Sequence, residues 1–192
     1  YLDALNVGYF LSLKSSEEGR ASPLIGQLIK QGYRNVFEDG SVVIYQNPGS
    51  LDRAYFVNKL RFVENKREMG DILNDPKFNP TNEAVVLGEP FKLSSSKAEV
   101  VSIDHGDNEV KLSVRAGGQS FLILADSFDP GWKAYLNGEK NKIYQVNGAL
   151  RGVRVPPGDS QIIFKYQPES FRNGIIISVF SAFSLLLLLS RL

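Results

Sequence analysis

The last residues of the chain carry the strongest single constraint on its structure. From Gly174 to Ser190 the sequence has no charged side chain, and Arg172 and Arg191 flank this run. Its seventeen residues reach the lower end of the roughly 17–25 apolar residues that a membrane-spanning helix needs. A buried core helix is the alternative, but it would show a polar side, and only three serines interrupt the run. The sequence therefore predicts a C-terminal transmembrane helix over residues 173–190.

The start of the chain and its composition narrow the class of protein further. The sequence opens on Tyr1, without methionine and without a signal peptide pattern, so we expect a segment of a longer membrane protein. A net charge of +1 with basic residues spread along the chain argues against nucleic acid as a partner. The chain has no cysteine, which rules out disulfides and thiolate metal sites. We expect no cofactor and no metal.

The second half of the sequence has the pattern of an all-β domain. Short alternating runs are separated by turn residues at intervals of roughly 8–12 positions, as in sandwiches and barrels. In residues 109–116 the apolar side chains alternate with polar ones, and residues 119–127 are apolar on both faces, which indicates a central strand. Asn-Gly pairs supply the left-handed backbone that hairpin turns require. We predict an antiparallel β-sandwich, of jelly-roll or carbohydrate-binding-module type, over residues 91–170.

The first half of the sequence mixes helical and strand patterns. Residues 23–33 have helical spacing after Pro23, and an Asp-Gly pair separates two strand-like runs between residues 33 and 47. We predict a small α+β subdomain over residues 1–90. A segment rich in serine and lysine, residues 87–99, reads as a linker.

One corner of the predicted sandwich carries the candidate binding residues. The only tryptophan, Trp132, lies between a Pro-Gly and an Asn-Gly turn, close to Asp126 and Asp129. An exposed indole beside carboxylates suits a sugar, whereas an indole that closes the end of a sandwich is a core residue, and the second reading is the commoner one. The full set of candidate ligand-binding residues is Trp132, Asp126, Asp129, Tyr135, Asn147 and Arg151.

Catalytic and metal chemistry find little support in the sequence. His105 is the only histidine, so no histidine cluster can form, and a surface turn is its simplest role. Asp104, Asp107 and Glu109 lack the order of a calcium loop. Asp126 and Asp129 could serve a hydrolase, but no converging pocket is evident. We predict no catalytic residue and no metal ligand in this chain.

Several phrases together resemble one family. The segments "SFDPGWKAYLNGE" and "NGALRGVRVPPGDSQIIFKYQPESFRNG" are similar to the C-terminal extracytoplasmic region of YfhO-like bacterial polytopic membrane proteins, which are related to GT-C glycosyltransferases. "LDALNVGYFLS" and "VVIYQNPGSLDRAYFV" extend the resemblance, although Asp52 stands where the family usually has proline before Arg53. The matching residues of the C-terminal block are Gly131, Trp132, Gly138, Arg151, Gly152, Pro157, Gly158, Tyr166 and Pro168.

The resemblance implies a location and a role. It places residues 1–170 outside the cytoplasm, with the lipid bilayer, the rest of the parent protein and glycan as the implied partners. In GT-C enzymes the catalytic acid lies in an early loop that this chain does not contain. The implied function is an accessory domain that binds or positions glycan. A structural module without a ligand is the alternative, and fold analogy alone does not decide between them.

Overall fold

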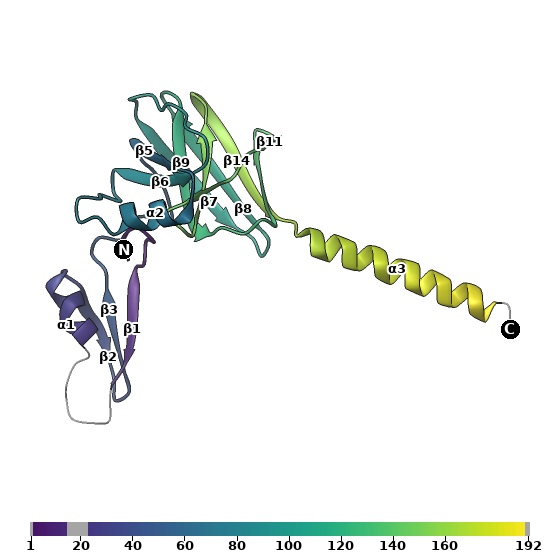
Figure 1. Ribbon diagram of the computed structural model, residues 1–192, viewed down its shortest axis with the longest axis horizontal. Coiled ribbons are helices and arrows are strands. Elements are labelled where there is room, and N and C mark those ends of the chain that lie inside the picture. The colour runs from purple at the N-terminus through teal and green to yellow at the C-terminus, as the bar shows by residue number, and fades with distance from the viewer. Residues whose placement is uncertain (1, 15–22, 191–192) are drawn as a thin grey trace.

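The computed structural model describes residues 2–14 and 23–190, apart from the side chains of Pro23 and of residues 185–188. Figure 1 shows three parts: a small lobe near the N-terminus, a β-sandwich, and a helix that projects from the sandwich to the C-terminus. The sandwich contains most of the strands and positions all the candidate residues.

One layer of the sandwich is a five-stranded antiparallel sheet. Its strands are β7 (Ala98–His105), β8 (Glu109–Ala116), β10 (Trp132–Leu136), β11 (Glu139–Asn141) and β14 (Gly158–Tyr166), in the order β11-β10-β14-β8-β7. In β8, Val110, Leu112 and Val114 are buried, while Lys111 and Arg115 are exposed. The predicted alternation of β8 is confirmed, because one face of an antiparallel sheet packs on the core and the other meets water.

The other layer is a six-stranded sheet that is buried on both faces near its centre. It contains β4 (Ala54–Phe56), β5 (Lys59–Val63), β6 (Glu83–Leu87), β9 (Ser120–Ser127), β12 (Tyr144–Val146) and β13 (Leu150–Val155), in the order β4-β9-β13-β12-β6-β5. All four side chains of 121–124 in β9 are fully buried. This sheet contains strands that precede residue 90 in the sequence and strands that follow it. The predicted boundary between subdomains at residue 90 therefore lies between strands of one sheet.

The two sheets enclose the main core. Their facing side chains form one buried cluster, with members from β8, β10 and β14 in one sheet and from β4, β9 and β13 in the other. The outer face of the six-stranded sheet carries a second cluster, which includes Phe121 and Tyr144. Helix α2 (Lys66–Leu73) covers the β5–β6 end of this sheet with Met69 and Leu73. This arrangement agrees with a β-sandwich, and the jelly-roll assignment stays a prediction.

Two hairpin turns have the backbone that their sequence requires. Asn137 and Gly138 join β10 to β11 with φ of 51° and 88°, and Asn147 and Gly148 join β12 to β13 with φ of 48° and 85°. Positive φ at both central residues defines the type I′ turn, whose twist matches that of the paired strands. The turn chemistry predicted at both Asn-Gly pairs is confirmed.

The small lobe has one helix packed on one sheet. Strands β1 (Tyr9–Leu13), β3 (Val42–Gln46) and β2 (Arg34–Glu38) form an antiparallel sheet in that order. Helix α1 (Pro23–Lys30) buries Ile25 and Leu28. This lobe has the helix and the β2–β3 hairpin that the sequence predicts in its first half.

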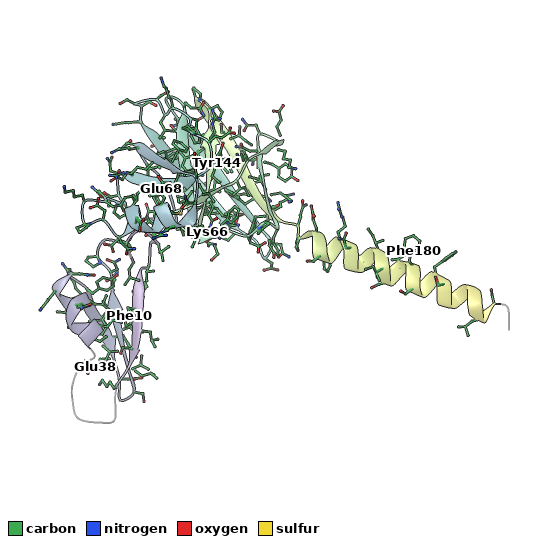
Figure 2. The ribbon with its side chains drawn as sticks, in the orientation of Figure 1. Phe10, Glu38, Lys66, Glu68, Tyr144 and Phe180 are labelled. Carbon is green, nitrogen blue, oxygen red and sulfur yellow. The ribbon has the colours of Figure 1, made fainter. Side chains whose placement is uncertain are left out.

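Helix α3 (Glu169–Leu189) follows β14 and leaves the sandwich. The apolar side chains that the structure describes in α3 are not covered by the rest of the described chain: Phe180 is 69% exposed and stands away from the helix in Figure 2. The first turn carries Glu169 and Arg172, and no helix within the described residues is both long enough and apolar enough to cross a membrane. The prediction for residues 173–190 is therefore corrected: the helix forms, but its role as a membrane span is not supported.

Candidate functional site

The corner between β9 and β10 is built by local hydrogen bonds. Asp129 accepts a hydrogen bond on Oδ1 from the backbone N–H of Gly131 at 2.7 Å, and its carbonyl accepts one from Trp132 N–H at 3.1 Å. Gly131 sits so close to its neighbours that an added Cβ would lie 2.7 Å from Cε2 of Tyr166. Asp129 therefore closes the turn with its carboxylate, as aspartates in such turns commonly do.

Trp132 lies against the interior of the sandwich instead of forming an open platform. The indole is half-buried and packs on the main core cluster. The Arg151 guanidinium carbon lies 3.8 Å from the centre of the indole ring, and the Tyr166 ring centre lies 5.1 Å away at an interplanar angle of 52°. A cation over an aromatic face is an attractive contact. Because Arg151 occupies one face of the indole, that face is not available to stack on a sugar.

Asp126 bridges two arginines that differ sharply in exposure. Arg151 is 1% exposed and donates from Nη2 to Oδ2 of Asp126 at 2.7 Å. Arg53, whose side chain is 48% exposed, makes a two-pronged contact with the same carboxylate, with Nε–Oδ1 at 2.8 Å and Nη2–Oδ2 at 2.9 Å. Two parallel N–H···O bonds between a guanidinium and a carboxylate fix the relative orientation of the two groups and strengthen the ion pair. Strands β9 and β13 and the residue before β4 therefore meet at one carboxylate.

The pKa values of the two arginines shift in opposite directions because the two side chains differ in burial. Burial lowers the pKa of the Arg151 guanidinium, and the nearby charge of Asp126 and its hydrogen bond oppose this shift. For Arg53 the hydrogen bonds that it donates to Asp126 are the largest influence, and they raise the pKa of its guanidinium. Nε and Nη1 of Arg151 are buried without a hydrogen-bond partner among the described residues, so Asp126 is the main compensation for this buried charge.

His105 joins this group from β7. Arg53 Nη1 lies 3.1 Å from His105 Nδ1 and 3.3 Å from His105 Nε2. Sequence reasoning treated His105 as a surface turn residue and did not name Arg53 as a site residue. The only sequence signal for Arg53 was its place in the family-like segment "LDRAYFV", because 73 positions separate it from Asp126.

The remaining two candidate residues lie elsewhere. Tyr135, on β10, is half-buried, and its hydroxyl approaches Oε1 of Gln167 at 3.5 Å. Asn147 is 0% exposed: its Oδ1 accepts from Val85 N–H at 2.9 Å, and its Nδ2 donates to the Ala4 carbonyl at 2.9 Å. A fully buried amide whose bonds are internal cannot contact a ligand. Asn147 joins the β12–β13 turn to β6 and the N-terminal segment.

A small hollow lies beside the corner. Its volume is about 210 Å³, and the corner residues 128–130, the start of β10 and residues 140–143 line it. Sites for small molecules usually measure about 300–1,000 Å³. The hollow is therefore small for a glycan, although Trp132 contributes to its wall.

The acidic stretch that follows His105 takes part in ion pairs within the domain. Glu109, a member of the acidic stretch after His105, contacts Lys111 at 2.8 Å and Lys165 at 2.9 Å. These lysines lower the pKa of the Glu109 carboxyl through hydrogen bonds and charge. Among the residues that the structure places, no group of three histidine, aspartate or glutamate side chains could hold a metal ion.

The fold and the corner define a β-sandwich domain with an internally braced end and an exposed apolar helix. The model of a family described as "Bacterial membrane protein YfhO" matches residues 73–178, more than half of the chain, so the class is a domain of a bacterial membrane protein. The chain belongs to the YfhO family.

One curated relative and the solved structures complete the comparison. An uncharacterised protein YfhO of Bacillus subtilis (strain 168) is 28% identical over 74 residues, which cover 38% of this chain and 9% of that protein. The matched segment is thus a small part of a much longer relative. No solved structure matches this chain.

Proposed function

We propose that this chain is a non-catalytic structural domain of a larger YfhO-family membrane protein, and that its corner serves as an internal brace. The single observation that carries this proposal is the burial of Arg151 between Trp132 and Asp126. The residues that a sugar would need for stacking and hydrogen bonding are engaged within the domain. This favours the structural alternative over glycan binding at the corner.

The brace adds side-chain contacts between strands that already pair within one sheet, and it reaches the segment that leads to α3. Asp126 ties β9 to β13 through Arg151 and to the start of β4 through Arg53. Gly131 accepts a backbone hydrogen bond from Gln167 at 2.7 Å, in the segment that leads from β14 to α3. The corner therefore stiffens the end of the sandwich from which α3 leaves.

The activity of the whole protein is a further part of the proposal. The resemblance to GT-C-related proteins supports a parent that transfers sugar from a lipid-linked donor, with its catalytic residues outside this chain. The long relative, of which the match covers 9%, leaves ample chain for a membrane portion. In this proposal the sandwich lies on the extracytoplasmic side and packs against that membrane portion.

Titration with glycans tests the brace against the binding alternative. Because Trp132 is the only tryptophan, its fluorescence reports on the corner alone. We expect neither intensity nor emission maximum to change when cell-wall oligosaccharides are added, because Arg151 already covers one face of the ring. Unfolding in denaturant serves as the positive control, since it must shift the emission. A saturable change with any glycan would contradict the proposal.

Labelling of whole cells tests the proposed location. The chain has no cysteine, so Ser95→Cys in the exposed loop before β7 adds a single thiol to this domain of the parent protein. We expect a membrane-impermeant maleimide to modify it in intact cells. The parent without the substitution corrects for other cysteines. Labelling only after permeabilisation would place the domain in the cytoplasm.

A further inference from the structure

The hollow beside the corner is lined by three lysines. Lys133 lies on β10, Lys140 on β11 and Lys142 in the segment that follows β11, and all three contribute to the wall. Lys133 Nζ donates to the Pro130 carbonyl at 3.2 Å, and Lys142 Nζ lies 4.8 Å from the centre of the Tyr144 ring. Neither contact neutralises the charge of the ammonium group, because a carbonyl oxygen and an aromatic ring carry no net charge.

The charges around the hollow are unbalanced. Within the described residues, none of the three lysines forms an ion pair, in contrast to Lys111 and Lys165, which share Glu109. Asp129 is the one acidic residue in the wall, and its Oδ1 already accepts from Gly131 N–H. The wall therefore carries three cationic residues and one engaged carboxylate, a balance that favours an anion. Its volume of about 210 Å³, small for a glycan, is ample for a phosphate group.

The position of the hollow indicates where such a phosphate comes from. Its corner contacts the segment that enters α3: an added Cβ on Gly131 would lie 3.2 Å from Cβ of Pro168, immediately before the helix. Beyond that point α3 exposes large apolar side chains, including Phe171 and Ile177. A basic patch beside uncovered apolar groups is the combination that membrane surfaces with anionic lipids attract.

We infer that Lys133, Lys140 and Lys142 form a binding site for the phosphate of anionic phospholipid headgroups, which seats this end of the sandwich on a membrane surface. The inference rests on the proposed position of the domain against a membrane, but it requires no glycan, no transferase activity and no particular side of the membrane. Lysines near an anionic surface each contribute about fivefold to binding.

Vesicle binding of the 192-residue chain tests the site. The variant K133Q/K140Q/K142Q is compared with wild type on vesicles of phosphatidylcholine alone and on vesicles with added phosphatidylglycerol. We expect wild type to prefer the anionic vesicles and to lose this preference in high salt. The variant should lose at least about tenfold in affinity for anionic vesicles and keep its affinity for phosphatidylcholine.

Two further variants separate the site from general charge effects. K66Q/K77Q/K92Q removes the same charge from exposed lysines outside the hollow and should keep the preference. The variant K133R/K140R/K142R keeps the charge at the three positions and should keep the preference.

Three results would overturn the inference: no preference of wild type for anionic vesicles, equal losses in the two glutamine variants, or full displacement by millimolar inorganic phosphate. The last result would indicate a site for small free anions instead of lipid. Sidedness labelling and the glycan titration do not depend on these lysines, so the failure of this inference is distinguishable from that of the proposed function.

Discussion

Replacing Asp126 with alanine is expected to lower the free energy of unfolding by about 3–5 kcal/mol, because it leaves the buried guanidinium of Arg151 without its carboxylate. Arg151 is 1% exposed, so its guanidinium has almost no contact with water that could compensate for the lost partner. Denaturant unfolding, followed by the fluorescence of Trp132, measures the change. The same transition reports directly on the ring that Arg151 contacts.

The second ion pair of Asp126, with Arg53, provides a control for this prediction. Arg53→Ala removes the other ion pair of Asp126, but this arginine is half exposed, and exposed pairs contribute about 0–1 kcal/mol. The double variant Asp126→Ala/Arg151→Met should recover part of the loss, because no uncompensated charge stays buried. Equal effects of Asp126→Ala and Arg53→Ala would show that Arg151 is not the partner that matters.

Replacing Asn147 with alanine is expected to cost about 2–4 kcal/mol of unfolding free energy. The substitution strips Val85 N–H and the Ala4 carbonyl of their side-chain partners in a dry interior, and it puts alanine at a φ of 48°. Both effects destabilise the folded chain. Thermal or denaturant unfolding of the variant measures their sum.

Asn137 is the matched control for this prediction. It has nearly the same backbone, with φ of 51°, and also precedes glycine in a turn between strands. Its side chain, however, is exposed and accepts a hydrogen bond from Gln161 N–H at 2.8 Å in contact with water. Asn137→Ala should therefore show the backbone effect without the cost of unpaired buried groups. If both variants lost equal stability, the bonds to Val85 and Ala4 would contribute nothing.

At these two sites and in the turn beside them, four of the six predicted binding residues make contacts within the domain. Asp126 and Arg151 hold the corner together, Asp129 closes its turn, and Asn147 ties the sandwich to the N-terminal segment. The lysines of the neighbouring hollow, by contrast, leave their charge free for an external partner. In our proposal, the interaction surface of the domain lies next to Trp132 and does not use its ring as a platform.

Local features of this chain could be predicted from its sequence. The alternation in β8, the doubly buried β9 and the two Asn-Gly turns depend on side-chain periodicity and on backbone preferences within a few residues. The family resemblance was likewise contained in the order of residues in the C-terminal block and is confirmed by the match over residues 73–178. The uncharged C-terminal run correctly indicated a helix.

Contacts between distant segments were decided by the tertiary structure alone. Asp126 and Arg53 are 73 residues apart, and the pairing of β4 with β9 brings them together. Whether Trp132 would be a platform or a packed ring depended on Arg151, which the packing of one sheet on the other places over the indole. Sequence patterns report what each residue prefers locally, whereas the partner of a charge or an aromatic face is set by how strands pair and sheets pack.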